Sequence, residues 1–493
     1  MPRTTADDSS LFVARVRDLI KRPPVTCTAE LTAIAVARQL SRDGVGSVVV
    51  CDPQGAPVGI VTDRDLRRKV VAEGLDPSQI SAHTIMSAPL VTVAPDAFAF
   101  EAVLEMTRRE IHHLVVVEGS RLAGVISSYD LLRLQAAHPV TLAREIGRAP
   151  SLEALAEQAI RVTPLIRQLF EAGGRAYDIG QIVAELNDRL VARVLALTAE
   201  TFTAQGDALP PVPYCWLVFG SEARREQTLR TDQDNGLVYA DPPVDEAAKV
   251  AAHYARFAAA AIRGLVTVGF PPCPADLMAS NPEWCQPLSV WSGYFRRWLT
   301  EAWPAQVAAA LTLFDLRPIG GASALAEALL SIVRTEAPAQ ESFLRVLARE
   351  AISGESALTL WGRVAVERRG PRRGAIDLKH RGTQQLVGAG RAHALEFGLT
   401  EMNTLDRMRA ASQLGVYTER ELREIEDAYE FLAHLRIASQ LARMAGASPP
   451  DNWIDPGQLS RTEVTLLREA LRVVEHVKAR VNKRYGVGAL PGL

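Results

Sequence analysis

The sequence is poor in cysteine and contains no long apolar run. Its 493 residues include five cysteines, scattered and without a C-x-x-C pair: Cys27, Cys51, Cys215, Cys273 and Cys285. This pattern argues against a disulfide framework or a zinc site and fits a reducing cytosol. No apolar run reaches the length of a transmembrane helix, and the start, MPRTTADDSS, has no signal-peptide core. We therefore expect a cytoplasmic protein that does not cross a membrane.

The charge of the sequence is nearly balanced. Lys and Arg number 55 against 57 Asp and Glu, so the formal net charge is −2. A global attraction to nucleic acid or to an anionic membrane is therefore not expected, and no basic, aromatic-rich tract stands out. The composition, 48% hydrophobic and 23% charged, is ordinary for a globular protein. The length suits roughly three domains.

The most informative stretch is Cys215–Ala240, CWLVFGSEARREQTLRTDQDNGLVYA, which predicts a strand, a tight turn and a second strand. Asp232 and Asp234 are two residues apart, and such residues of a strand point to the same face. Adjacent carboxylates repel each other, and a divalent metal such as Mg²⁺ offsets the repulsion. Backbone N–H groups of the Gly220–Ser221 turn can hold a phosphate nearby. These are the parts that nucleotidyl transfer needs, and the alternative is a polar hairpin with solvated acids.

The spacing Gly-Ser, ten residues, Asp-x-Asp resembles the signature of the DNA polymerase β-like nucleotidyltransferase superfamily. The longer string GSEARREQTLRTDQDN resembles a bacterial family of nucleotidyltransferases that carry CBS domains. More distantly, it is similar to the protein-PII uridylyltransferase and the glutamine-synthetase adenylyltransferase. Two departures stand out. Ala223 replaces a frequent Gly, and Gln233 and Asn235 are polar where apolar residues usually alternate, but neither change removes a metal ligand.

The resemblance calls for a third acid, and Asp315 in Leu311–Gly321, LTLFDLRPIGG, is the candidate. It is the single acid in an apolar run that predicts a strand, and it resembles the D-x-R-x-x-P segment of the adenylyltransferase relatives. A buried charge needs a partner, so we expect a cation beside it. The alternative is a strand-end acid paired with Arg317.

An internal repeat occupies residues 21–136. The copies end VGIVTDRDLRRKV and AGVISSYDLLRLQ, and three pairs match at an offset of 65: Gly59 and Gly124, Thr62 and Ser127, Asp65 and Asp130. The β-α-β-β-α order of each copy resembles a tandem pair of CBS domains, which implies a homodimer through this pair. Two copies of this size stack to complete one core.

The CBS resemblance implies two adenine-nucleotide sites, in which Asp65 and Asp130 accept ribose hydroxyls and Thr62 and Ser127 hold phosphate. The alternative is that the two hydroxyls simply cap helices. The neighbouring His112 and His113 lack acidic or Cys partners at ligand spacing, so we predict packing or surface roles for them.

The remaining segments predict helical and loop structure. Gly269–Leu299 is Pro-rich until about Leu288 and resembles a C-P-x-x-x-M-A-x-N-P-x-W stretch of the same family; its two cysteines form no metal signature. In RRGAIDLKHR, Lys379 resembles the Lys of a D-x-K element and would neutralise the triphosphate, with Asp377 orienting it; the alternative is a helix-start salt bridge.

The sequence thus predicts an α/β multidomain protein. The expected domains are a tail and helix at 1–20, the CBS pair at 21–136, a helical connector at 137–205, a nucleotidyltransferase domain at 206–321 and a helical bundle at 322–493. The predicted function is transfer of a nucleoside monophosphate from an NTP, of the uridylyl or adenylyl type, to an acceptor such as a protein, under control of adenine nucleotide. The alternative is a non-catalytic, nucleotide-sensing adaptor.

The predicted site residues follow from these motifs. Two Mg²⁺ or Mn²⁺ ions would be held by three catalytic acids: Asp232, Asp234 and Asp315. The triphosphate would be bound by Gly220, Ser221, Arg224 and Lys379. The net charge argues against an RNA acceptor, so nucleic acid is not an expected partner.

Overall fold

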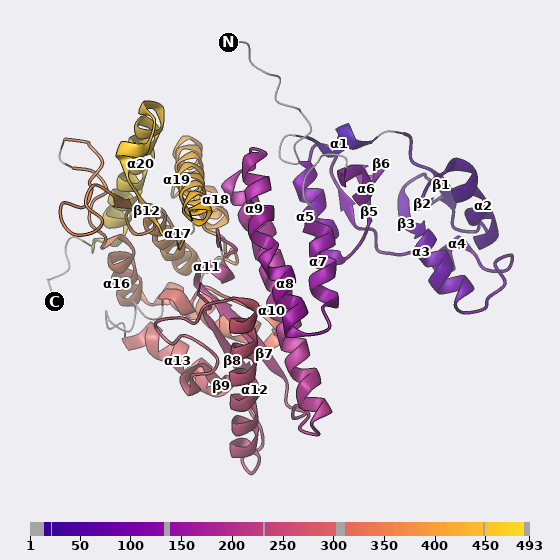
Figure 1. Ribbon diagram of the computed structural model, residues 1–493, viewed down its shortest axis with the longest axis horizontal. Helices are drawn as coiled ribbons and strands as arrows, with labels where there is room; N and C mark the ends of the chain where they lie inside the picture. Colours follow the sequence, from indigo (N-terminus) through magenta and orange to yellow (C-terminus); the bar gives the residue numbers. More distant parts are fainter. Residues whose placement is uncertain are drawn as a thin grey trace. The chain divides into compact units, whose positions relative to one another are not determined.

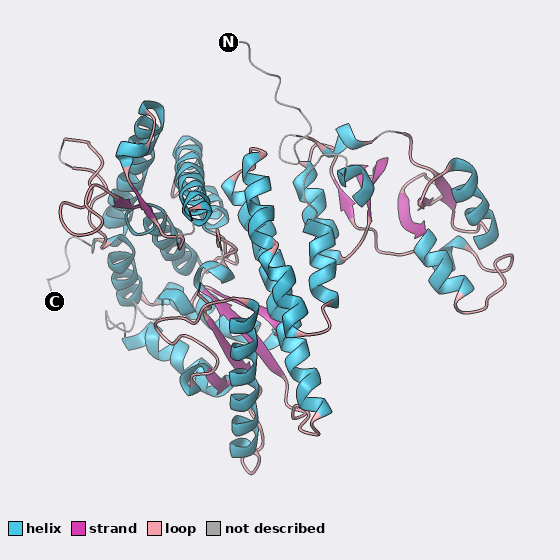
Figure 2. Ribbon diagram, viewed as in Figure 1, coloured by secondary structure: helices cyan, strands magenta, loops and turns pink. Residues whose placement is uncertain are grey.

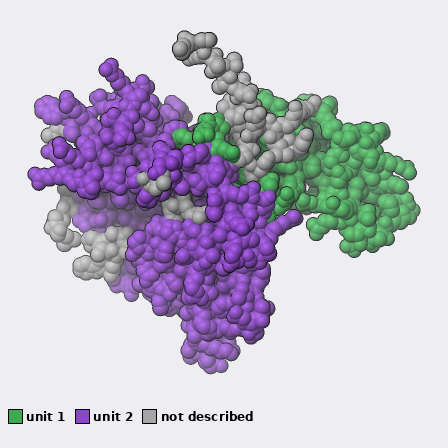
Figure 3. All heavy atoms as spheres, in the orientation of Figure 1, with its two compact units in different colours: residues 1–144, 168–174 green, residues 145–167, 175–493 purple. Residues whose placement is uncertain are grey.

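Two compact units make up the chain in the computed structural model, which describes residues 14–20, 22–132, 139–229, 232–301, 311–359, 361–446 and 449–487. The first unit contains residues 1–144 and 168–174, and the second contains residues 145–167 and 175–493 (Figure 3). Figure 1 shows the elements in chain order, and Figure 2 shows that strands occur in both units.

The first unit contains two small sheets, one from each copy of the repeat. Its elements are α1 (Val16–Leu19), β1 (Thr26–Thr28), α2 (Ala33–Asp43), β2 (Ser47–Cys51), β3 (Pro57–Thr62), α3 (Asp63–Leu66), η1 (Arg67–Val71), α4 (Ala82–Ile85), β4 (Thr92–Val93), α5 (Ala99–Arg109), β5 (His113–Glu118), β6 (Arg121–Ser127) and α6 (Ser128–Leu132). In one sheet β1 pairs parallel with β2, which pairs antiparallel with β3. In the other, β4, β5 and β6 repeat this arrangement, as the internal repeat predicts.

The repeated glycines are needed for close packing. A β-carbon on Gly59 would lie 2.3 Å from Sδ of Met86, and one on Gly124 would lie 2.8 Å from Cδ1 of Ile20. These separations are too short for a side chain. In each copy, a larger residue at this position of the strand would displace the neighbouring side chain, Met86 or Ile20.

The second unit is built around a four-stranded sheet. Its elements up to residue 336 are α8 (Leu152–Ile160), α10 (Ala176–Ala204), β7 (Tyr214–Phe219), α11 (Gly220–Ala223), β8 (Asn235–Tyr239), α12 (Ala247–Val268), η2 (Pro282–Trp284), β9 (Cys285–Pro287), α13 (Leu288–Glu301), β10 (Leu316–Gly321) and α15 (Ser323–Glu336). The strand order is β10-β7-β8-β9, with β7 antiparallel to both neighbours and β8 parallel to β9. The expected strand-turn-strand around the D-x-D pair is therefore present as β7, α11 and β8.

The helix α10 packs on this sheet, although its sequence predicts a part of the helical connector. It packs against α12 and β10. The contact with α12 is tight, because a β-carbon on Gly264 would lie 2.8 Å from Cγ1 of Val194. The helices α7 (Pro139–Arg148) and α9 (Val162–Glu171) each have residues in both units.

The C-terminal part of the second unit is mainly helical. Its elements are η3 (Ala337–Ala339), α16 (Glu341–Ile352), β11 (Ile376–Asp377), η4 (Lys379–Thr383), α17 (Gln384–Phe397), α18 (Thr404–Gln413), α19 (Glu419–Ala445), β12 (Trp453–Ile454), η5 (Pro456–Gln458) and α20 (Arg461–Tyr485). The helices predicted at Asn403–Gln413 and Glu419–Leu441 are confirmed as α18 and α19. Thr418 starts α19 with a capping box, in which its hydroxyl accepts from the N–H of Glu421.

One predicted strand is shorter than expected. Residues 311–313 of the apolar run end a helix, and β10 begins only at Leu316. Apolar runs of this length do not separate a buried strand from a buried helix end, so periodicity alone misplaced the boundary. Among the helices that the structure describes, none is both long and apolar enough to cross a bilayer.

Candidate functional site

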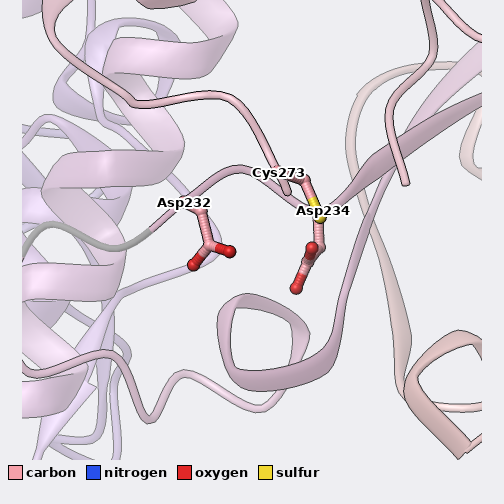
Figure 4. A group of neighbouring side chains, drawn as sticks. All are labelled: Asp232, Asp234 and Cys273. Atoms are coloured by element: carbon pink, nitrogen blue, oxygen red, sulfur yellow. The ribbon is translucent and has the colours of Figure 1, made fainter. Parts of the chain in front are cut away.

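The two acids of the D-x-D pair lie in an extended segment directly before β8. Asp232 is exposed and Asp234 is half-buried, whereas Gln233 between them is buried. The N–H of Phe219 donates to the carbonyl of Asp234 at 3.0 Å, which continues the pairing of β7 with this segment. The predicted alternation of faces is therefore present, and Figure 4 shows the two carboxylates as close neighbours.

The Gly-Ser turn lies beside the second acid. Gly220 has a φ of +58°, a left-handed conformation that favours glycine, and its N–H donates to the carbonyl of Asp315 at 3.0 Å. A β-carbon at residue 220 would lie 3.6 Å from Oδ2 of Asp234. Ser221 follows as a half-buried residue of α11. The structure thus brings together the predicted phosphate turn and one predicted metal ligand.

The polar residues that depart from the superfamily pattern hold a loop against the site. The side chain of Gln233 donates to the carbonyl of Phe270 at 3.2 Å, and its N–H donates to that of Pro271 at 3.1 Å. Asn235 accepts from the N–H of Ala279 at 2.9 Å through its side chain. These bonds fix both ends of the segment 270–279. The polar side chains of Gln233 and Asn235 therefore hold this loop in place.

The loop held in this way brings Cys273 into the site, a placement that the spacing of the cysteines does not predict. Its sulfur and one carboxylate oxygen from each of Asp232 and Asp234 all lie within 4.8 Å of one another (Figure 4). Cys273 is 8% exposed. The resemblance of this stretch to a family motif was the one signal that could have placed the cysteine here.

The environment of Asp234 opposes its ionisation. Burial raises the pKa of Asp234, the thiol of Cys273 counteracts this by a hydrogen bond, and the charge of Asp232 raises it further. The positive charge of Lys379 also favours the ionised form. An added cation at this place would stabilise both carboxylates.

Lys379 is electrostatically coupled to the two acids. Desolvation by the surrounding protein lowers the pKa of Lys379, and the charge of Arg436 adds to this effect. Asp232 and Asp234 act in the opposite direction. The structure therefore brings this predicted residue to the acids, although they are far apart in the sequence.

Asp377 holds the backbone that carries Lys379. Its Oδ1 accepts the N–H groups of Lys379 and His380 at 2.9 and 3.0 Å, and its Oδ2 lies 2.7 Å from Nδ1 of His380. Burial by itself would raise the pKa of Asp377, but hydrogen bonds from the side chain of His380 and from the N–H groups of His380 and Lys379 together lower it. Asp377 thus orients the start of η4 through the backbone rather than by a salt bridge to Lys379.

Asp315 is surrounded by cations, as we predicted for a buried acid. It is fully buried, and both oxygens accept hydrogen bonds from guanidinium groups. Arg224 and Arg391 each donate to Oδ2 at 2.6 Å, and Arg407 donates to Oδ1 at 2.7 Å. Among the described residues, the group of potential metal ligands does not include Asp315. We therefore assign Asp315 a structural role in place of the predicted metal ligand.

The expected cation beside Asp315 is present, but it is not Arg317. That residue pairs instead with Asp188 of α10, through two bonds of 2.7 Å. Burial by itself would raise the pKa of Asp315, whereas the three arginines hold it well below the usual range. Arg224 was predicted to bind the triphosphate, but it belongs to this ion cluster. Besides its bond to Asp315, its Nε donates to Glu226 at 2.8 Å. Arg224 is buried at 8% exposure and is a structural residue.

The first unit contains two cavities at the predicted adenine-nucleotide positions. A cavity of about 350 Å³ is lined by Thr62 and Asp65, and one of about 430 Å³ is lined by Ser127 and Asp130. His113 lines both. Burial lowers the pKa of His113, and the charge of a neighbouring histidine adds to this. His113 therefore lines both cavities in addition to the packing role that we predicted for it.

The hydroxyls of both motifs also cap the helices that follow, as the alternative interpretation predicts. Thr62 accepts from the N–H of Asp65 at 3.3 Å, and Ser127 accepts from that of Asp130 at 3.3 Å. Oδ1 of Asp65 accepts from the ammonium group of Lys69 at 2.8 Å and from the hydroxyl of Ser87 at 3.1 Å. The other oxygen, Oδ2, accepts from the N–H and the hydroxyl of Thr62, so a ribose at Asp65 would compete with internal donors at both oxygens.

Comparison with known families agrees with this architecture. Residues 160–305 match the family described as "Putative nucleotidyltransferase DUF294", and residues 341–485 match the "Putative nucleotidyltransferase substrate binding domain". Residues 16–72 and 82–137 match the CBS domain. The chain belongs to the CBS-domain-containing members of the DUF294 family, as the sequence motifs predicted. The resemblance to the protein-PII uridylyltransferase stays a prediction.

Individual relatives cover only about a quarter of the chain. It is 33% identical over 134 residues to the uncharacterized protein MK0525 of Methanopyrus kandleri, covering 27% of this chain and 68% of that protein. It is 36% identical to the arabinose 5-phosphate isomerase KdsD of Escherichia coli, covering 25% of this chain and 38% of that enzyme. A solved CBS domain protein, PAE2072 of Pyrobaculum aerophilum complexed with AMP, is 34% identical and covers 25% of this chain and 100% of its own, with a TM-score of 0.23.

Proposed function

We propose that the protein is a divalent-metal-dependent nucleotidyltransferase that moves a nucleoside monophosphate from an NTP to an acceptor. The observation that carries this proposal is the convergence of Asp232 and Asp234 beside the Gly220 turn. The acids occur in a chain of the DUF294 family, with a lysine from a distant segment coupled to them. These are the functional groups that nucleotidyl transfer requires.

The donor set fits a divalent cation. Two carboxylates and a thiol have their ligand atoms within 4.8 Å of one another, and carboxylate oxygens suit Mg²⁺ or Mn²⁺. Asp232 and Asp234 would hold the metal. When bound, it would supply Lewis-acid stabilisation of charge at the α-phosphate and lower the pKa of an acceptor hydroxyl.

The other residues would position the donor nucleotide. The turn of Gly220 and Ser221 would face the phosphates through the N–H of Ser221, because the left-handed glycine turns the chain there without a side chain in the way and its own N–H is donated to Asp315. Lys379 would neutralise the triphosphate and then the departing pyrophosphate, with Asp377 fixing its backbone. Lys379 lies within residues 341–485, the segment that matches the substrate-binding domain family.

A protein side chain is the acceptor class that we propose, with ATP or UTP as donor. The basis is the resemblance of the D-x-D and D-x-K strings to the two regulatory transferases, which is an argument by analogy. The paired acids and the coupled lysine favour catalysis over a non-catalytic adaptor, since an adaptor has no need to hold two repelling carboxylates together.

The CBS pair would bind adenine nucleotide and regulate the transfer. Each copy has a cavity that contains its predicted hydroxyl and carboxylate, and the two cavities share His113 and Gly46 as walls. Dimerisation through the CBS pair is part of this proposal.

Loss of the CBS carboxylates is expected to weaken adenine-nucleotide binding. In full-length protein, Asp65→Ala and Asp130→Ala each remove a ribose acceptor, worth about 1.5–3 kcal/mol for a hydrogen bond to a charged group. Calorimetry with AMP and ATP measures the effect on the single variants and the double variant. The control is Asp76→Ala, an exposed acid of the same unit that caps a turn. Unchanged affinity in the double variant would remove this site assignment.

Adenine nucleotide is expected to change the transferase rate through the CBS pair. An effector shifts an equilibrium only by its differential affinity for two states, typically about 1–3 kcal/mol, or roughly 5–150-fold in affinity. The rate is measured across an AMP, ADP and ATP titration at fixed, saturating donor, in wild type and in a variant that lacks residues 1–136. A response in wild type that disappears in the truncated variant supports the proposal. Equal, effector-independent rates in both would contradict it.

The proposed activity is tested by incubating the protein with ATP or UTP labelled at the α-phosphate, a divalent metal and a cell lysate. Label on a macromolecule that requires metal and active protein is the expected result. Comparing ATP with UTP identifies the donor, and protease treatment against ribonuclease treatment identifies the acceptor class. If no label is transferred with either nucleotide under any metal, the proposed function is wrong.

A further inference from the structure

The thiol of Cys273 is in the metal-ligand group, and a thiol is not a ligand that Mg²⁺ prefers. Its sulfur lies within 4.8 Å of a carboxylate oxygen of both Asp232 and Asp234. The side chain is held there by a loop anchored at both ends to the D-x-D segment, through Phe270 and Ala279. The geometry is therefore built by the fold and is not an accident of a free side chain.

We propose that Cys273 is a third protein ligand of the site, and that the site therefore prefers a thiolate-accepting divalent ion of the zinc class to Mg²⁺. This inference rests on the proposed function, because it concerns the metal of the same site. Thiolate ligands select softer transition ions, whereas Mg²⁺ takes oxygen ligands almost exclusively. Two carboxylates and a thiolate, with open positions left for substrate, form a donor set that suits a catalytic zinc-class ion.

The separations in the structure are compatible with one ion. A Zn–S bond of about 2.3 Å and a Zn–O bond of about 2.2 Å at a tetrahedral angle place sulfur and oxygen about 3.7 Å apart on a shared ion. The three ligand atoms lie within 4.8 Å of one another, so side-chain rotations that shorten these separations by up to about 1 Å would place them on one ion. The thiol proton would pass to solvent as the metal binds.

The alternative is that Cys273 acts only as a hydrogen-bond donor that positions Asp234. The two roles differ in what a serine can replace. The hydroxyl of Cys273→Ser keeps a donor of similar reach, so a positioning role survives the substitution. A soft ligand is lost in the same variant, so a thiolate-dependent metal preference does not survive it.

The test is a Co²⁺ titration of the full-length protein, followed by ultraviolet absorption. Wild type should show a sulfur-to-cobalt charge-transfer band that saturates with one site. Cys273→Ser should lose the band and at least about tenfold in Co²⁺ affinity, while Mg²⁺ affinity changes by less than about twofold. Asp234→Asn should also lose the band, and this loss would assign the band to a metal ion bound at this site. Cys51→Ser, a half-buried cysteine in the first unit, is the matched control and should keep it.

The inference is overturned if wild type binds no Co²⁺, if bound Co²⁺ gives no charge-transfer band, or if Cys273→Ser keeps the band. Circular dichroism of each variant separates loss of metal from loss of fold. The experiment distinguishes failure of this inference from failure of the proposed function: a cobalt–thiolate band without nucleotidyl transfer leaves the ligand assignment standing and contradicts the activity. Nucleotidyl transfer without the cobalt–thiolate band supports the activity and contradicts the assignment of Cys273 as a ligand.

Discussion

Asp234→Asn is expected to abolish nucleotidyl transfer while leaving the fold intact. The substitution keeps the size of the side chain and removes a metal ligand. Even changes outside the ligand shell cost 10–100-fold, so a loss of more than about 100-fold in rate is expected. Asp232→Asn should behave in the same way, because both carboxylates belong to the same ligand group.

Asp234→Asn should not lower the stability of the metal-free protein, although it should abolish activity. Burial and the charge of Asp232 both raise the pKa of Asp234, so its ionised form destabilises the metal-free protein at neutral pH. The melting temperature of Asp234→Asn without metal should equal or exceed that of wild type. Asp245→Asn, an exposed acid outside the site, is the control and should alter neither quantity. Near-wild-type transfer by either site variant would show that these acids are not the metal ligands.

Asp315→Asn is expected to cause the largest loss of stability of any single acid substitution considered. The carboxylate is 0% exposed and compensates three buried arginines. Removing one partner of a buried ion pair typically costs about 3–5 kcal/mol, because the remaining charges are left uncompensated. Denaturant unfolding of Asp315→Asn beside Asp245→Asn measures this difference.

The pH dependence of that loss has a definite sign. The arginines hold the folded-state pKa of Asp315 well below the unfolded value of about 3.9. A carboxyl with a depressed folded pKa contributes stability above the unfolded pKa and loses it as the pH falls toward the folded pKa. The stability difference between wild type and variant should therefore be full above about pH 4 and shrink in stronger acid. A loss under about 1 kcal/mol at neutral pH would contradict the structural role of this cluster.

The sequence predicted the parts of the fold and site that depend on short-range patterns. The offset of 65 between Asp65 and Asp130 was sufficient to predict two similar sheets, because each copy repeats the same local order of strands and helices. The spacing of Asp232 and Asp234 predicted their common face, because this follows from the two-residue period of an extended chain.

Long-range partners could not be predicted in this way. Asp315 pairs with Arg391 and Arg407, which follow it by 76 and 92 residues, and nothing in the local string indicates which arginines will reach it. The resemblance to a metal-binding segment therefore outweighed the structural interpretation. Cys273 was missed for a similar reason. Its neighbours in the sequence are Pro and Ala, and it reaches the acids only because Gln233 and Asn235 hold its loop.

The most direct test of the central claim compares two labels in one assay. Wild type and Asp234→Asn are incubated in parallel with metal, lysate and the same NTP, labelled either at the α-phosphate or at the γ-phosphate. Nucleotidyl transfer predicts that wild type attaches the α-label to an acceptor and releases the γ-label as pyrophosphate, and that Asp234→Asn does neither. Attachment of the γ-label by wild type in excess of that seen with Asp234→Asn, or equal attachment of the α-label by both proteins, would contradict a nucleotidyltransferase that works through these two carboxylates.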